Sequence, residues 1–187
     1  NFTITEDVEV TMECNPATVT KESLCAYRKA GINRLSIGLQ STDNKLLEDL
    51  GRIHTYEQFL DTYSLARKVG FDNINVDMMS ALPNQTLEQY ENALKKVVEL
   101  GVEHISAYSL IVEEGTPFFE RFQKDELSLP DEDVERRMYY RTKEILEAAG
   151  YFRYEISNKK KKGYECKHSL RYWERKDYIG IGLGASS

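Results

Sequence analysis

Residues 34–40 alternate between branched apolar side chains and small or polar ones, which is the pattern of a β-strand with two different faces. The apolar positions are Leu35, Ile37 and Leu39, and the intervening positions are Ser36, Gly38 and Gln40. A parallel strand that is buried on both faces has a continuous apolar sequence instead. The polar row therefore indicates that one face of this strand lines a cavity.

Two other segments, 8–14 and 71–79, show the same alternation. Their polar faces consist of Glu9, Thr11 and Glu13 in the first segment and of Asn73, Asn75 and Asp77 in the second. Three predicted strands thus direct polar side chains the same way, and a carboxylate or amide lies near the end of each. An inward carboxylate is costly to bury unless it is paired. Either these side chains satisfy one another, or they bind a ligand.

Glycines divide the chain into a repeat of helix and strand. Helical patterns end at Gly31, Gly51, Gly70, Gly101 and Gly150. Strand patterns follow four of them, at 32–40, 71–79, 102–112 and 151–157, and segments 8–14 and 178–184 bring the total to about six. Alternating strands and helices predict a parallel α/β sheet with right-handed crossovers. Because the chain has no GxGxxG or Walker motif, we expect an incomplete (β/α) barrel rather than a doubly wound sheet.

The sequence also predicts where two helices begin. Residues 55–58 and 86–89 both have the form of a capping box, and apolar residues recur behind them at helical spacing. The longest helical pattern covers 131–149. We expect these apolar stripes to form the core rather than a cofactor site.

Composition narrows the possible classes of protein. The chain has 187 residues, a net charge of -6 and 41% hydrophobic residues, which is enough for one sizeable core. It has neither a membrane-spanning apolar run nor a signal-like segment, so we expect a cytoplasmic protein. The acidic balance argues against nucleic acid as a partner. The one compact basic run, Lys159–Lys162, is interpreted as a solvated turn.

The cysteines and the chain ends suggest a piece of a longer protein. Cys14, Cys25 and Cys166 are too few and too scattered for a disulfide framework, and no CxxC spacing occurs. The chain starts at Asn1 rather than at a methionine and stops within a glycine-rich stretch. We therefore expect that a site within this sequence is completed by residues outside it.

The candidate site lies where the strands end, because barrels of this type carry their functional groups at the C-terminal ends of the strands. The strand ends provide Glu13, Gln40, Asp77 and Ile111, and Arg52 follows Gly51 as the expected countercharge. Carboxylates can bind ammonium groups and ribose hydroxyls, and a guanidinium can bind a carboxylate through two hydrogen bonds. This set of groups suits a nucleoside that carries an amino acid.

Four stretches of the chain carry a resemblance to a known family: Met12–Pro16, Asn33–Ser41, Leu50–His54 and Asn75–Thr86. They resemble the radical S-adenosylmethionine (SAM) proteins of the oxygen-independent coproporphyrinogen III oxidase group, and the resemblance covers essentially the whole chain. Residues Tyr164–Trp173 and Asp177–Gly182 are similar to the heme chaperone branch of that group.

The resemblance implies a set of cofactor contacts. Glu13, Gln40, Arg52 and Asp77 are expected to contact SAM, with Ile111 as an apolar wall near the adenosine. The CxxxCxxC loop that holds the [4Fe–4S] cluster in the family is absent from this sequence. Residues 1–187 are therefore expected to be the C-terminal part of a partial barrel and the start of the following family-specific region. By itself this fragment is expected to be inactive.

His168 has two interpretations. It is a structural histidine that is hydrogen-bonded near Trp173, or it is an axial heme ligand, as the resemblance to the chaperone branch implies. Cys166, two residues earlier, is a candidate second ligand. The chain departs from the branch at two positions: Ser169, where an asparagine is usual, and Ser186, where a histidine is usual.

Three functions stay open at this point. The first is a heme chaperone that binds a cluster, SAM and heme and hands the heme to an acceptor protein. The second is an oxidase that decarboxylates coproporphyrinogen III to protoporphyrinogen IX. The third, from another class, is a non-redox barrel lyase or isomerase that uses Glu13 and Asp77 as acid and base. That third function needs a lysine base or a phosphate-binding loop, and the predicted inner faces contain neither.

Overall fold

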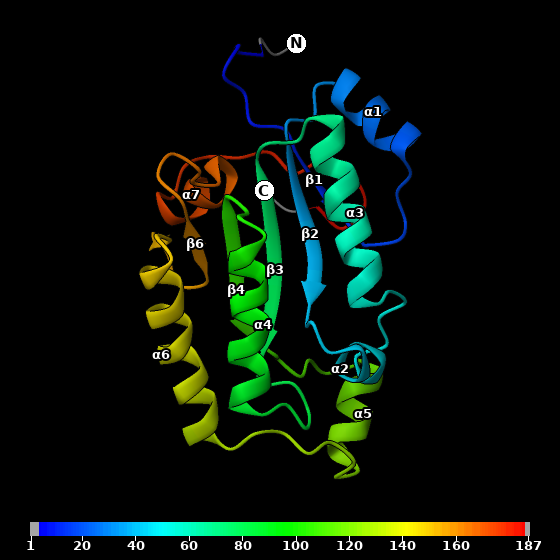
Figure 1. Ribbon diagram of the computed structural model, residues 1–187, viewed down its shortest axis with the longest axis vertical. Helices are drawn as coiled ribbons and strands as arrows, with labels where there is room; N and C mark the ends of the chain where they lie inside the picture. The colour runs from blue at the N-terminus through cyan, green and yellow to red at the C-terminus, as the bar shows by residue number, and fades with distance from the viewer. Residues whose placement is uncertain (1–3, 186–187) are drawn as a thin grey trace.

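The computed structural model describes residues 4–185, which form one six-stranded sheet with helices packed against it (Figure 1). Ser186 lies outside the residues that the structure describes. The elements are β1 (Thr11–Cys14), α1 (Lys21–Lys29), β2 (Arg34–Gln40), α2 (Asn44–Asp49), α3 (Tyr56–Val69), β3 (Ile74–Ser80), α4 (Leu87–Glu99), β4 (His104–Ser109), α5 (Pro117–Gln123), α6 (Glu132–Ala148), β5 (Phe152–Arg153), β6 (Asn158–Lys160) and α7 (Lys167–Trp173). The strand order is β1-β2-β3-β4-β6-β5. Strands β1 to β4 are parallel, which confirms the predicted crossover topology.

The last two strands differ from the prediction. Segment 151–157 contributes only β5, and β6 at Asn158–Lys160 pairs antiparallel with both β4 and β5. Segment 178–184, which we expected to be a strand, contains none. Gly182 and Gly184 adopt positive φ angles of 111° and 75°, which are incompatible with continuous extended backbone. The alternating apolar residues of that segment are exposed.

The basic run is not a solvated turn throughout. Lys159 lies within β6 and is only 4% exposed. Its ammonium group donates hydrogen bonds to the backbone carbonyls of Ala107, Ile156 and Ser157, at 3.5, 3.5 and 3.1 Å. Burial lowers the pKa of Lys159 to about 8. Every residue has a main-chain carbonyl, so the sequence does not indicate which carbonyls will accept hydrogen bonds from Lys159. The burial of this side chain could therefore not be predicted.

The predicted helix boundaries are confirmed. Thr55 and Thr86 each accept a hydrogen bond from the backbone N–H three residues later, and the glutamine at that position bonds back to the threonine N–H. Both capping boxes are therefore complete. At the end of α3, Gly70 adopts the left-handed conformation that closes a helix. These caps fix the residues at which α3 and α4 begin and the residue at which α3 ends.

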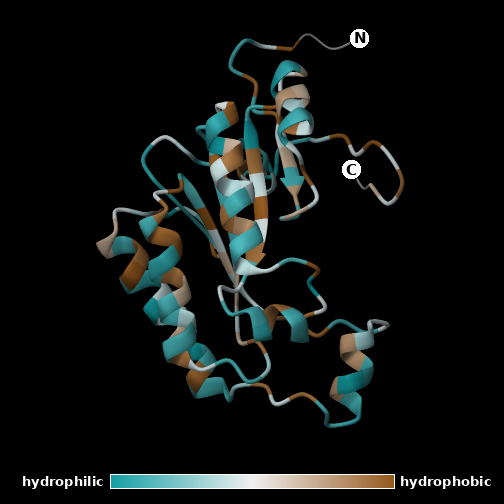
Figure 2. Ribbon diagram, turned by 45° about the vertical axis from the view of Figure 1, so that its right-hand side comes forward, coloured by the Kyte–Doolittle hydropathy of each residue, from teal (hydrophilic) through white to brown (hydrophobic). Residues whose placement is uncertain are grey.

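The core lies between the sheet and one layer of helices. Helices α3, α4 and α6 cover one face of strands β2 to β4 (Figure 1). The fully buried strand residues on this face are Leu35, Ile37, Leu39, Ile74, Val76, Met78 and Ile105. Apolar and polar bands alternate along the strands and helices (Figure 2). No helix within residues 4–185 is long and apolar enough to cross a membrane. The opposite face of the sheet carries the polar rows and faces a cavity.

Candidate functional site

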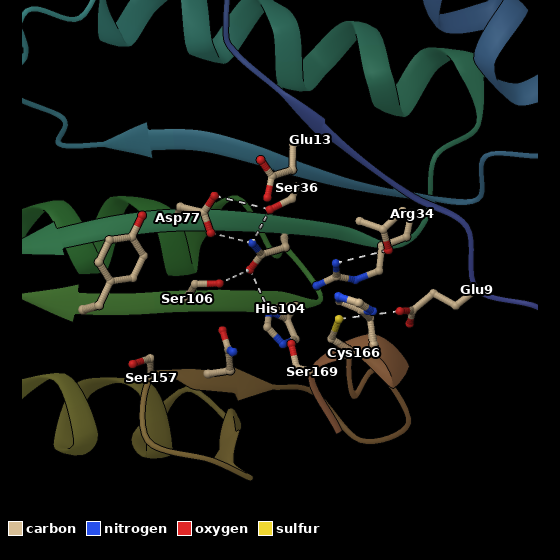
Figure 3. A pocket seen from close by; sticks show the side chains of 15 residues that line it. Glu9, Glu13, Arg34, Ser36, Asp77, His104, Ser106, Ser157, Cys166 and Ser169 are labelled. Atoms are coloured by element: carbon tan, nitrogen blue, oxygen red, sulfur yellow. Dashed lines mark hydrogen bonds between the residues drawn. The ribbon is translucent and has the colours of Figure 1, made fainter. Parts of the chain in front are cut away.

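The polar face of β1 to β4 lines a cavity of about 600 Å³, and the start of α7 borders this cavity at one edge (Figure 3). Strand pairing explains how the polar rows meet. Glu13 is opposite Ser36, Gly38 is opposite Asp77, and Asp77 is opposite Ser106. Because all these strands are parallel and in this register, their alternate side chains project into one space. The predicted cavity is therefore present.

A second cavity of about 350 Å³ adjoins the first at the C-terminal ends of the strands. Glu13, Gln40, Arg52 and Asp77 all line it. The structure thus brings together four of the residues that the sequence singled out. Its two carboxylates, guanidinium and amide match the chemistry of an amino acid joined to a nucleoside, and SAM has this composition.

A bulge and a glycine shape this cavity. The register of β2 against β3 shifts between Gly38 and Gln40, and Gln40 adopts a φ of 69°, which turns its side chain at the strand end. Tyr108 Oη donates a hydrogen bond to Gln40 Oε1 at 3.3 Å. A Cβ atom on Gly38 would lie 2.9 Å from Arg52 Nη2 and 2.9 Å from Gln40 Nε2. Glycine at this position therefore allows both side chains to lie across the strand.

The loop after α2 places Arg52. His54 is buried, and its Nε2–H donates to the Leu39 carbonyl at 3.3 Å, which fastens this loop to β2. Burial lowers the pKa of His54. We expected Arg52 to pair with the site carboxylates, but it takes part in none of the ion pairs found in residues 4–185. Its guanidinium faces the cavity instead.

Asp77 is held by its neighbours on β2 and β3. Ser36 Oγ donates to Asp77 Oδ2 at 3.3 Å, and Asn75 Nδ2 donates to Asp77 Oδ1 at 2.8 Å (Figure 3). Asn75 Nδ2 also donates to Ser36 Oγ at 2.8 Å. The carboxylate is only partly exposed, and these donors fix its orientation while leaving lone pairs for a ligand.

A buried histidine extends this network across the sheet. Asn75 Oδ1 can only accept, so His104 Nδ1 carries the hydrogen of their 2.6 Å hydrogen bond. His104 Nε2 then accepts from Tyr154 Oη at 2.8 Å, and Tyr154 accepts from the Cys166 N–H at 3.3 Å. Burial and the nearby Arg34 charge lower the pKa of His104 to about 3. Burial raises the pKa of Tyr154 to about 12. Both groups are neutral at pH 7.

The sequence analysis missed the contribution of β4. His104, Ser106 and Tyr108 line the large cavity, while Ile105 and Ala107 are buried against the helices. This alternation is the same signal that identified β2 and β3. The predicted strand extended over 102–112 and so placed its end at Ile111, whereas β4 ends at Ser109.

Ile111 and His168 occupy different surroundings. Ile111 lies two residues beyond the end of β4, is 76% exposed and lines neither cavity. His168 is exposed on α7 and lines the large cavity together with Glu13 and Asp77. Its ring packs edge-on against Tyr172, with 4.8 Å between ring centroids. The predicted role of Ile111 near an adenosine stays a prediction.

The residues do not fit an iron–sulfur cluster. Within residues 4–185, no three histidine, cysteine or acidic side chains are grouped so as to hold a metal ion. The three cysteines are free, and burial raises the pKa of Cys14 to about 11, which disfavours the thiolate that binds metals. Cys166 Sγ instead lies 3.5 Å from Glu9 Oε1. This stretch of chain does not supply cluster ligands.

Replacing Gly38 by alanine is expected to narrow the smaller cavity and, with SAM as the test ligand, to lower the affinity about 10-fold without unfolding the protein. The new methyl group would displace the ends of two flexible side chains, Arg52 and Gln40, rather than backbone. Calorimetry on the full-length protein measures the affinity, and thermal unfolding reports the fold. Ala107→Gly, on the helix-facing side of β4, is the control for a changed methyl group in the sheet. Equal SAM affinity in wild type and Gly38→Ala would contradict the placement of both side chains.

Comparison with solved structures shows the fold. Coproporphyrinogen III oxidase (HemN) from Escherichia coli, whose structure is described as that of a radical SAM enzyme, matches 99% of this chain and 45% of its own with a TM-score of 0.81 and 23% identity. Archaeal Elp3 from Methanocaldococcus infernus matches 73% of this chain and 32% of its own with a TM-score of 0.66 and 21% identity. Both support the partial α/β barrel.

Comparison with curated proteins finds closer relatives. The heme chaperone HemW of Bacillus subtilis is 42% identical over 177 residues, which are 95% of this chain and 47% of that protein. HemW of Escherichia coli is 42% identical over 96% of this chain and 46% of that protein. A mouse protein named radical S-adenosyl methionine domain-containing protein 1, mitochondrial, is 40% identical over 96% and 40%. The chain thus spans less than half the length of these relatives.

A protein-family model matches the N-terminal half of the chain. The radical SAM superfamily model matches residues 3–97, a range that holds Glu13, Gln40, Arg52 and Asp77 and covers just over half of the 187 residues. This match, together with the strand topology, shows that the chain belongs to the radical SAM superfamily.

Proposed function

We propose that the full-length protein is a heme chaperone, which binds a tetrapyrrole in the large cavity and SAM in the adjoining one. One observation carries this proposal: His168 on α7 lines the same cavity as Glu13 and Asp77. An imidazole nitrogen is a common axial ligand of heme iron. The relatives named HemW, at about 40% identity over nearly the whole chain, support the same function.

The proposed SAM site consists of Glu13, Gln40, Arg52 and Asp77, which line the smaller cavity. The carboxylates suit the ammonium group and ribose hydroxyls, and Arg52 suits the carboxylate of the methionine part. Ile111, in the exposed loop after β4, is kept as an apolar contact of the adenosine. When bound beside a [4Fe–4S] cluster, SAM supplies radical chemistry. The cluster ligands are proposed to lie outside this sequence.

The chaperone proposal includes an acceptor protein for the heme and a cytoplasmic location. The alternative is the oxidase that decarboxylates coproporphyrinogen III. The likeness to HemN, at 23% identity, concerns the fold alone and does not favour that reaction.

The experiment that tests the proposal is an anaerobic titration of the reconstituted full-length protein with heme. We expect a Soret band in the wild type and a shifted, weaker band in His168→Ala, with the affinity lowered at least about 10-fold. Lys167→Ala is the matched control, because Lys167 is the exposed neighbour of His168 but does not line the cavity. Identical Soret bands in His168→Ala and wild type would remove the ligand role. Conversion of coproporphyrinogen III by the wild type would favour the oxidase.

A further inference from the structure

Arg34 is a buried cation in the wall of the large cavity. It is the first residue of β2 and lies on the same strand face as Ser36, but it is only 3% exposed. Its side chain extends from β2 across the cavity toward Cys166 at the start of α7 (Figure 3). None of the contacts described for SAM involves this residue.

The charge of Arg34 is not neutralised by residues 4–185. Its Nε is buried and has no hydrogen-bond partner there, and its guanidinium makes one long hydrogen bond, from Nη1 to Thr11 Oγ1 at 3.5 Å. Arg34 takes part in none of the ion pairs found in this part of the chain. The positive charge of Arg34 also helps to lower the pKa of the nearby His104.

None of the three carboxylates that line the cavity, Glu9, Glu13 and Asp77, forms an ion pair with Arg34. Glu9 accepts hydrogen bonds from the Lys167 N–H at 3.1 and 3.2 Å, and Asp77 accepts from Ser36 and Asn75. His104 is neutral and already makes a hydrogen bond with each ring nitrogen. A guanidinium that is desolvated without a counterion is unfavourable, and its planar donors fit a carboxylate. The missing partner is therefore an anion that enters the cavity.

The position of Arg34 separates it from the proposed SAM carboxylate. Arg34 begins β2 and Gln40 ends it, so at about 3.3 Å per residue their backbones lie about 20 Å apart. The smaller cavity has its own guanidinium in Arg52. Arg34 instead shares the large cavity with His168.

We propose that Arg34 binds a carboxylate side chain of the tetrapyrrole. This inference rests on the proposed function and extends it. One ligand would then be held at two points, with its metal at His168 and a peripheral carboxylate at Arg34. The site would select tetrapyrroles that carry free carboxylates over those in which the carboxylates are esterified.

The test compares heme with heme dimethyl ester, in which both carboxylates are neutral methyl esters, using the full-length protein under anaerobic conditions. Wild type is expected to bind heme about 10- to 100-fold more tightly than the diester. Arg34→Gln is expected to bind the two equally, and Arg34→Lys to keep part of the preference. SAM affinity is expected to be the same in all three proteins. Arg52→Gln is the matched control: it removes a cavity arginine, weakens SAM binding and keeps the preference for heme.

Several outcomes would overturn the inference. Arg34→Gln could retain the full preference for heme over the diester, or wild type could bind both equally. A loss of SAM affinity in Arg34→Gln with the preference intact would assign Arg34 to the cofactor. A melting temperature several degrees lower in unliganded Arg34→Gln and Arg34→Met would show that Arg34 pairs with another part of the full chain. Failure of wild type to bind either compound would instead reject the proposed function itself.

Discussion

Asp77→Ala is expected to lower the affinity of the full-length protein for SAM about 100-fold. Asp77 is one of the carboxylates proposed to bind the ammonium group or the ribose hydroxyls of the cofactor, and a hydrogen bond to a charged group contributes about 1.5 to 3 kcal/mol. A loss of about 3 kcal/mol corresponds to about 100-fold in affinity. Ser36 and Asn75 hold the carboxylate in place before the ligand binds, so little ordering is required on binding. Anaerobic calorimetry with SAM measures the change.

The fold is expected to tolerate this substitution. After the carboxylate is removed, Asn75 Nδ2 still donates to Ser36 Oγ, and the space opens to the cavity, where water can replace the lost acceptor. Asp72→Ala is the matched control, because Asp72 is an exposed carboxylate in the loop before the same strand. It should bind SAM like the wild type. Equal affinity in Asp77→Ala and Asp72→Ala would reject the assignment of Asp77.

The site could be predicted from the sequence where its signal was local. Along β2, every second residue faces the cavity, so the row that ends in Gln40 was visible in a seven-residue stretch. The same reasoning placed Glu13 and Asp77 on one face, and the parallel register then brought them together. Helix boundaries were predictable for the same reason, because a cap depends on residues three or four positions apart, as at Thr55.

Features that depend on distant partners could not be predicted. His104 contacts Asn75 and Tyr154, which are 29 and 50 positions away in the chain, and no periodic pattern encodes these contacts. Lys159 is buried because its strand pairs with β4 and provides carbonyl acceptors. Segment 178–184 has the alternation of a strand, but no neighbouring strand pairs with it in the described part of the chain. Alternation of apolar and polar residues favours a strand, but a strand forms only where a neighbouring strand pairs with the segment.

His104 is expected to make the fold sensitive to acid. Its pKa falls from 6.5 to about 3 on folding, because burial and the charges of Arg34, Lys159 and Lys160 disfavour the protonated ring. A histidine with a lowered folded pKa contributes stability that is complete above pH 6.5 and is lost progressively as the pH falls toward 3. At 1.36 kcal/mol per pH unit, the loss is about 2 kcal/mol at pH 5 and approaches about 5 kcal/mol below pH 3.

Urea unfolding of the full-length protein at pH 7.5 and at pH 5 measures this effect. His104→Gln should be less stable than wild type at pH 7.5 but should lose about 2 kcal/mol less between the two pH values. His168→Gln, which replaces an exposed histidine, should follow the wild type, and a parallel pH dependence in His104→Gln would refute the prediction. The hydrogen bonds give the reason for the sensitivity. A proton on His104 Nε2 would make this nitrogen a donor, so the Tyr154 hydroxyl hydrogen would have to rotate away, and the Tyr154 oxygen would then face both this N–H and the Cys166 N–H beside α7. Acid is therefore expected to weaken the link between β4 and the start of α7, the helix that carries His168.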